Sequence, residues 1–113
     1  MALNYQEAKL ISGPLRIFDA SPVCDGAAAV VLSKFSATEL KGISEITVKI
    51  TGSGCATEQV GLAKRFNPLE GNAIRVSASA ALKMADVERD EIDFFELHDA
   101  YSVMAALSIE ALG

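Results

Sequence analysis

The second half of the chain alternates between the two periodicities of regular structure, and this order limits the folds open to it. Residues 46–51 alternate apolar and polar side chains with a period of two, which predicts a strand. Residues 67–85 have apolar side chains at helical spacing, which predicts a helix. A second short strand is predicted at residues 93–97. Strand, helix and strand in this order imply a parallel sheet with a right-handed crossover. The sequence therefore predicts an α/β fold with a mixed or parallel sheet and packed helices.

The first half predicts shorter elements. Residues 1–13 are expected to form a helix that ends in a turn at Ser12-Gly13-Pro14, and residues 15–18 a brief strand or an extended lead-in. Residues 19–26 are rich in turn formers and predict a loop. Residues 27–33 are apolar on both faces, which is typical of a buried strand in the middle of a covered sheet. A helical turn is expected at residues 36–40.

The start of the long helix is well marked in the sequence. Asn67 can cap it, Pro68 suits the first helical position, and Glu70 completes a capping-box pattern. Five residues are expected to form the inward stripe of this helix: Ala73, Val76, Ala80, Met84 and Val87. Because most of these side chains are small, the helix can lie close to its sheet. A final helix is predicted at residues 101–112.

Composition excludes several classes of protein. The formal net charge is −5, and the ten Lys and Arg residues form no run, so a nucleic-acid-binding surface is not expected. No apolar stretch is long enough to cross a bilayer, and the N-terminus does not resemble a signal peptide. Cys24 and Cys55 have no metal-type spacing and are expected to be reduced thiols in a cytoplasmic protein, with a disulfide as the alternative.

The chain has one histidine, His98, at the junction between the last predicted strand and the last predicted helix. Ligands of open α/β sheets bind at the carboxyl ends of strands, so this position is a candidate site. His98 is either a capping or surface residue, or a hydrogen-bond donor or general base beside Asp99. Two other loops, residues 19–26 and 52–57, also adjoin predicted strands. All three could converge on one edge of the sheet.

The glycines of the middle loop leave two interpretations open. Gly52 and Gly54 follow a strand, as in a nucleotide-binding loop, but the third glycine of that motif is replaced by Thr57. A structural turn is the favoured interpretation, and a small nucleotide-binding domain is the alternative.

Taken together, the three loops resemble the thiolase family. The strings "PLRIFDASPVCDGAAAVVLS", "GSGCAT" and "IDFFELHDAYSVMAALSIEALG" occur in the family in this order and at these separations. The resemblance runs from about Lys9 to Gly113 and is greatest to the archaeal and sterol-carrier-protein type branch, because other thiolases have Asn-Glu-Ala-Phe where this chain has His98 to Tyr101. It implies a partial thiolase-like fold.

The resemblance also implies a chemistry and roles for individual residues. Thiolases transfer acyl groups between coenzyme A thioesters, by Claisen condensation or its thiolytic reverse. His98 matches the residue that helps form the oxyanion hole for the thioester oxygen, and Ser21 matches the serine that meets the pantetheine arm. Asp25 is expected to shape the Ser21 loop through backbone hydrogen bonds, and Gly26 to allow close packing there. No permanently bound cofactor and no metal are expected, since the coenzyme A thioester is the substrate.

Two departures from the family affect what the isolated chain can do. Thiolases are much longer, and their nucleophilic cysteine and Gly-His-Pro histidine match no position of this chain. Residues 1–40 are therefore expected to be the end of the N-terminal thiolase half, and residues 41–113 the first part of the C-terminal half. The chain alone is expected to be inactive and to bind coenzyme A weakly or not at all. Alternatively, it is a non-catalytic half-thiolase that forms a homo-oligomer, or joins another chain, through exposed sheet edges.

Overall fold

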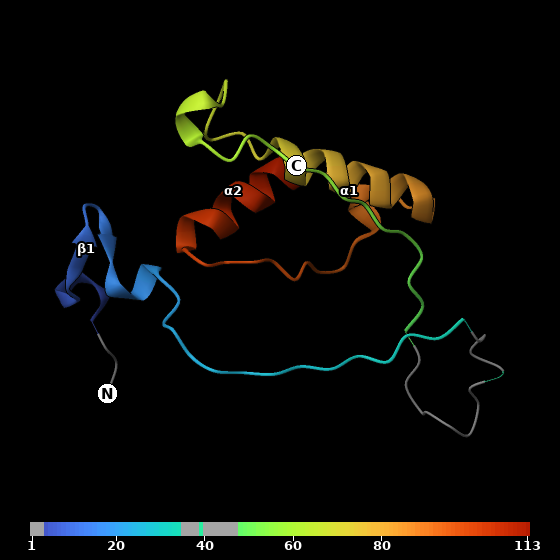
Figure 1. Ribbon diagram of the computed structural model, residues 1–113, viewed down its shortest axis with the longest axis horizontal. Coiled ribbons are helices and arrows are strands. Elements are labelled where there is room, and N and C mark those ends of the chain that lie inside the picture. Colours follow the sequence, from blue (N-terminus) through green and yellow to red (C-terminus); the bar gives the residue numbers. More distant parts are fainter. Residues whose placement is uncertain (1–3, 35–38, 40–47) are drawn as a thin grey trace.

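The computed structural model describes residues 4–34, 39 and 48–113 (Figure 1). Two α-helices lie side by side, and a small hairpin lies near the first turn of the second helix. The elements follow one another in the order η1 (Tyr5–Glu7), β1 (Leu10–Ser12), β2 (Leu15–Arg16), η2 (Ile17–Asp19), η3 (Leu62–Lys64), α1 (Asn72–Ala85), η4 (Arg89–Glu91) and α2 (Ser102–Leu112), where η denotes a 3₁₀-helix. Apart from residue 39, the helical turn expected at 36–40 lies outside the described residues.

The N-terminal region is a hairpin and not the expected helix. Strands β1 and β2 pair antiparallel, with Leu10 opposite Arg16 and Ser12 opposite Leu15. The turn between them is at residues 13 and 14, where the sequence predicted it, and its Gly13–Pro14 peptide bond is cis. The helix prediction for residues 4–13 is wrong for two reasons. Pro14 disfavours helical backbone at the residue before it, and strand β2 supplies hydrogen-bond partners to β1. The brief strand expected at residues 15–18 is confirmed for its first two residues.

Three other expected strands do not form in the described residues. Residues 27–33, 48–51 and 93–97 belong to no ladder, and the only named sheet in the described ranges is the antiparallel hairpin. Val30 and Val31 are 83% and 97% exposed, so residues 27–33 do not form the predicted buried strand. The physical reason is that a strand requires a hydrogen-bonded neighbour, which apolar patterning does not supply. The predicted parallel crossover sheet is therefore not formed in the described residues.

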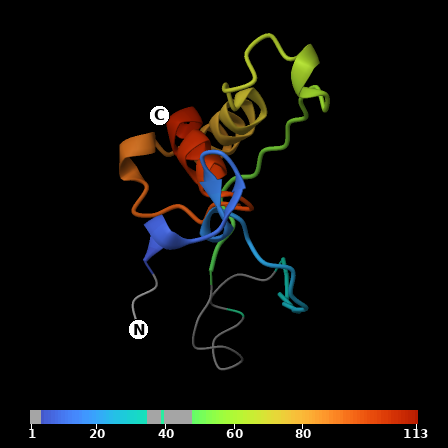
Figure 2. The same ribbon diagram turned by 90° about the vertical axis from the view of Figure 1, so that its left-hand side faces the viewer.

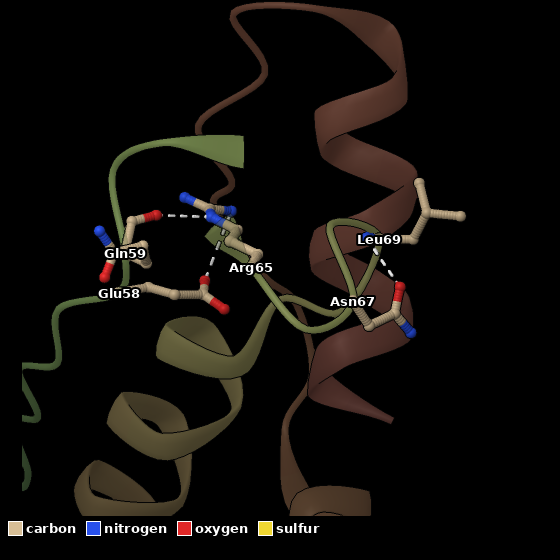
Figure 3. Close-up of polar contacts among 5 residues, drawn as sticks. All are labelled: Glu58, Gln59, Arg65, Asn67 and Leu69. Atoms are coloured by element: carbon tan, nitrogen blue, oxygen red, sulfur yellow. Dashed lines mark hydrogen bonds and ion pairs between the residues drawn. The ribbon is translucent and has the colours of Figure 1, made fainter. Parts of the chain in front are cut away.

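Helix α1 begins four residues later than predicted, with its N-cap at Gly71 in place of Asn67. Asn67 instead forms a turn: its side-chain oxygen accepts the Leu69 N–H at 3.1 Å, as Figure 3 shows. Gly71 occupies the N-cap position and offers no side chain for capping. At the other end, Asp86 has a left-handed backbone (φ 56°, ψ 48°), and its N–H donates to the last carbonyls of α1. Short polar residues tolerate this conformation best after glycine, so Asp86 ends the helix.

An arginine closes the loop that precedes α1. Arg65 donates from Nε to the carbonyl of Gln59 at 2.7 Å, and its Nη1 lies 3.5 Å from a carboxylate oxygen of Glu58 (Figure 3). The ion-paired side chains are only 24% and 19% exposed. The loop around η3 is thus held by one side chain.

The inward face of α1 agrees only in part with the predicted stripe. Ala73 and Val87 are partly covered, whereas Ala80 is exposed and Val76 and Met84 are 45% and 64% exposed. The covered face instead includes Ser77 and Ala81, against which the extended segment 48–57 lies (Figure 1, green). A side chain at Gly54 would overlap the backbone carbonyl of Ser77. Close contact between the segment and the helix therefore requires glycine at this position.

Helix α2 has the bounds that the sequence predicted to within one residue, and it packs against α1. The contact is close: a Cβ added to Gly71 would lie 2.9 Å from that of Ala111. Ser108 is 7% exposed and donates its hydroxyl hydrogen to the carbonyl of Met104 at 2.7 Å. It is the sole buried residue in the described part of the chain, and no described hydrophobic residue is buried.

The accessible surface of the chain is large for its mass. It amounts to 10229 Å² for 11.9 kDa, whereas a compact monomer of that mass exposes about 6,000 Å². The excess is apolar in several places, including Val23, Leu32 and Phe66. Within the described ranges, no helix combines the length and apolar character needed to span a membrane.

Candidate functional site

The structure brings the Ser21 loop against the residues that follow His98. The Ser21 N–H donates to the carbonyl of Ala100 at 3.0 Å, and the Ser21 hydroxyl donates to the carbonyl of Asp99 at 3.4 Å. Ala20 and Tyr101 form an isolated antiparallel bridge beside these contacts. The two loops are separated by almost eighty residues in the chain, so tertiary structure alone brings them together. Figure 2 shows the hairpin, from which the Ser21 loop leaves, in front of α2.

His98 lies four residues before the first turn of α2. Its side chain is exposed, as is that of Asp99, while Ala100 between them and the helix is partly covered. Tyr101, the N-cap residue, has extended backbone (φ −137°, ψ 146°) and makes no side-chain cap. The backbone bends at Ala100, between His98 and α2. An exposed imidazole at such a junction can donate a hydrogen bond to a ligand that approaches from solvent.

A carboxylate holds this junction to the hairpin. Asp19 accepts hydrogen bonds on both oxygens: Oδ1 from the Ser102 hydroxyl at 2.7 Å, and Oδ2 from the Tyr5 hydroxyl at 2.5 Å and the Arg16 N–H at 2.7 Å. The Arg16 guanidinium lies 5.9 Å from the centre of the Tyr5 ring, within range of a cation–π contact. Four residues, Tyr5, Arg16, Asp19 and Ser102, join η1, β2, η2 and α2, and we call them the Asp19 cluster.

Hydrogen bonding shifts the pKa of two members of this cluster in opposite directions. The pKa of Asp19 is lowered, chiefly by the hydrogen bond from the Tyr5 hydroxyl and then by those from Arg16 and Ser102. The pKa of Tyr5 is raised, chiefly by the same hydrogen bond to Asp19. Both shifts favour the protonation states in which the phenol donates to an ionised carboxylate.

The third predicted loop does not join this site. Residues 52–57 lie along α1, where Gly52 faces the backbone of Ala81 and Gly54 that of Ser77. The two glycines therefore allow close packing on a helix, which supports the structural interpretation over a phosphate cradle. Gly26 was expected to allow close packing in the Ser21 loop, and this is wrong, because an added Cβ would meet nothing within 4 Å.

The two cysteines do not pair with each other. Cys24 and Cys55 are both free and exposed, as the sequence predicted. Among the described residues, no group of three or more histidine, cysteine, aspartate or glutamate side chains could hold a metal ion.

Sequence reasoning did not identify Asp19 as part of the site. The available signal was weak: Tyr101 makes no side-chain cap at the start of α2, and the next residue, Ser102, has a hydroxyl that requires an acceptor. Asp19 accepts from that hydroxyl. The sequence does not say which of its fifteen acidic residues is this acceptor.

Comparison with known proteins assigns the family. A family model described as thiolase C-terminal domain-like matches residues 44–113, which is more than half of the chain. The chain belongs to the thiolase family. The match confirms the expected partial thiolase-like α/β fold, while the division of the chain at residue 40 stays a prediction.

Individual relatives are acetyl-CoA acetyltransferases. The one from Methanothermobacter thermautotrophicus is 34% identical over 104 residues, which are 92% of this chain and 27% of the relative. The one from Methanocaldococcus jannaschii is 29% identical over 91% of this chain and 26% of its own length. The one from Schizosaccharomyces pombe is 31% identical over 90% of this chain and 24% of its own length. The chain thus spans about a quarter of the length of these relatives, and the archaeal matches agree with the branch that the His98 junction resembles.

Proposed function

We propose that this chain supplies the coenzyme A thioester contact and the oxyanion donor of a thiolase-type acyltransferase. The supporting observation is the pair of hydrogen bonds from Ser21 to the carbonyls of Asp99 and Ala100, which puts the Ser21 loop next to His98. Family membership and relatives that are named acetyl-CoA acetyltransferases support the reaction class. The reaction is the Claisen condensation of acyl-CoA thioesters or its thiolytic reverse.

Ser21 has a defined role in this proposal. A serine hydroxyl has one hydrogen to donate, and this hydrogen is directed to the Asp99 carbonyl. The lone pairs of its oxygen stay available, so Ser21 can accept the N–H of an amide in the pantetheine arm. The Ser21 loop would then orient the thioester relative to His98.

His98 would stabilise negative charge on the thioester oxygen. The hydrogen bond from an imidazole N–H to that oxygen strengthens as the enolate forms. One such donor typically stabilises the transition state by about 3–4 kcal/mol. The N–H groups at the start of α2 lie a few residues away and also favour negative charge. The nucleophile and the base would come from outside this stretch, since neither Cys24 nor Cys55 matches a catalytic thiolase cysteine. The isolated chain is therefore proposed to be inactive.

Binding and turnover test the two parts of this proposal separately. The purified chain is expected to bind acetyl-CoA at most weakly in calorimetry. It is not expected to consume acetoacetyl-CoA and coenzyme A, which is measured by the absorbance of the 3-ketothioester. Ser21→Ala should weaken the binding several-fold. Ser33→Ala, at another exposed serine of the stretch that follows η2, should not. Turnover that disappears in His98→Ala would refute the proposed inactivity, and equal binding by both serine variants would refute the role of Ser21.

A second candidate function is a non-catalytic half-thiolase that associates with another copy or another chain. The supporting observation is the unpaired, apolar segment 27–33, in which Val31 is 97% exposed. Extended backbone without a neighbour tends to recruit one. Light scattering should show a dimer or larger species that Val31→Lys converts to a monomer. Val60→Lys, at an equally exposed valine elsewhere, is the control. A wild-type chain that stays monomeric at high concentration would contradict this function.

The cellular setting proposed for the chain follows from its chemistry. Two exposed free thiols, Cys24 and Cys55, suit the reducing cytoplasm, and coenzyme A thioesters are used in lipid metabolism. Neither nucleic acid nor a membrane is a proposed partner.

A further inference from the structure

Asp19 lies at one end of a short antiparallel contact between the Ser21 loop and the start of α2. Three successive pairs make up this contact: Asp19 with Ser102, Ala20 with Tyr101, and Ser21 with Ala100. As one chain advances by a residue, the other retreats by one, so all three pairs share a single register. The contact at Asp19 is made by side chains, whereas the contact at Ser21 includes a backbone hydrogen bond.

Register determines which side of the extended chain Ser21 presents. Successive side chains of an extended segment point to opposite sides, so a slip of one residue would turn Ser21 away from Asp99. A short contact with one backbone hydrogen bond specifies its register weakly. The bond from the Ser102 hydroxyl to Asp19 adds a specific pairing that a slipped register could not make.

The carboxylate is itself held from the opposite side. Its second oxygen accepts from the Tyr5 hydroxyl in η1 and from the Arg16 N–H in β2. All partners of Asp19 are donors, so an ionised carboxylate satisfies them and an amide, with one acceptor oxygen and two hydrogens, does not. The orientation of Oδ1 toward Ser102 therefore depends on the charge and shape of a carboxylate.

We propose that Asp19 is the positioning residue of the site: by accepting from Ser102 on one oxygen and from the hairpin on the other, it fixes the register that holds Ser21 beside the His98 junction. Asp19 touches no substrate and acts through Ser21. The inference rests on the proposed function for its consequence in coenzyme A thioester binding, while the register itself is a property of the chain alone.

Two readouts on the full chain test this role. Asp19→Asn is expected to speed amide hydrogen exchange at Ser21 about fivefold, as the loss of surface hydrogen bonds predicts, and to weaken acetyl-CoA binding by a similar factor. Exchange at Ser108 in the middle of α2 should stay unchanged, which separates the loss of register from unfolding. Unchanged exchange at Ser21 in Asp19→Asn would overturn the proposal.

Variants at Ser102 test the pairing without a change of charge. Ser102→Ala should also speed amide exchange at Ser21. Ser102→Thr, which keeps the hydroxyl, should leave that exchange as slow as in the wild-type chain. Ser79→Ala, at an exposed serine of α1, is the control. The double variant Asp19→Asn, Ser102→Ala should bind acetyl-CoA no more weakly than Asp19→Asn alone, because the Ser102–Asp19 bond is lost in either case. Fully additive effects would contradict the proposal.

The two proposals fail in different ways. A wild-type chain that shows no heat with acetyl-CoA, but whose Ser21 exchange responds to Asp19→Asn, would refute the proposed function and support the role of Asp19. A chain that binds acetyl-CoA equally well with and without Asp19→Asn would overturn the role of Asp19 and leave the function standing.

Discussion

The hairpin and the extended segment 48–57 each attach to a helix, but by different physics. The hairpin meets the start of α2 through directional hydrogen bonds that converge on Asp19. The segment 48–57 meets α1 through shape, since Gly52 and Gly54 lie directly against helix backbone. The first attachment should respond to charge and be indifferent to volume. The second should respond to volume and be indifferent to charge.

The largest effect is expected from one methyl group in the packed attachment. In Gly54→Ala the new Cβ would overlap the carbonyl of Ser77, and a helix carbonyl cannot move aside as a flexible side chain can. Overpacking of this kind lowers the free energy of unfolding by about 1–3 kcal/mol. Urea titration of the variant and the wild-type chain measures this loss.

The matched control for this prediction is Gly26→Ala. Nothing lies within 4 Å of a Cβ at Gly26, so the same methyl group should be neutral or slightly stabilising through the unfolded chain. Equal stability of the two variants would remove the basis for treating the segment 48–57 as packed by shape.

A medium effect is expected from pH on the hydrogen-bonded attachment. Because the pKa of Asp19 is lowered in the folded chain, its contribution is complete above the ordinary carboxyl range of about 4 and is lost as the pH falls through the lower folded pKa. Because the pKa of Tyr5 is raised, its contribution is complete below about 10 and is lost as the pH rises through the raised folded pKa.

Nuclear magnetic resonance of the Tyr5 ring measures the alkaline limit directly. Its titration midpoint should move down toward the ordinary tyrosine value in Asp19→Asn, since the carboxylate is the first cause of the shift. The amide of Ala81, in the packed attachment, should keep its protection across the same range. Loss of protection at Ala81 together with that at Ser21 would mean that the two attachments are not separate.

The smallest effect is expected at Arg65, which holds a loop but attaches no element to a helix. Arg65→Gln removes the ion pair with Glu58 and the donor to Gln59, and a partly exposed pair of this kind is worth about 0.5–1 kcal/mol. Lys64→Gln, one residue earlier, is the control for charge. Thermal unfolding should separate the two variants by only a few degrees, and a loss as large as that of Gly54→Ala would contradict the ranking.

Local signals predicted the parts of the fold that local interactions determine. The turn before Pro14 and the helix α2 lie where the sequence placed them, because proline geometry and helical hydrogen bonds act within a few residues. The end of α1 was also close to its prediction, but its start was not. Asn67 used its side chain for a turn, which competes with capping in the same residue type.

Elements that depend on distant partners were predicted less well. Residues 27–33 have the composition of a central strand, yet a strand forms only where a neighbour is present. The covered face of α1 was misassigned because Val76 and Met84 are more hydrophobic than Ser77 and Ala81, whereas close contact with glycines selects small residues. Amphipathic periodicity identifies a helix but does not weigh volume against hydropathy.

The candidate site was predictable in part. The meeting of the Ser21 loop with the His98 junction followed from the resemblance of two separate strings to one family, and the structure brings the two loops together. The roles of Ser21 and His98 stay predictions. Asp19 could not be found in this way, because its importance depends on three partners that are distant in sequence from one another.

The large accessible surface has a thermodynamic consequence. The unfolded chain would expose about 17,000 Å², so unfolding from 10229 Å² uncovers only about three fifths of the area that a compact monomer of equal mass would uncover. Both the dependence of stability on urea and the heat-capacity increment scale with that area. Denaturation of this chain should therefore be broad in urea and weakly curved with temperature.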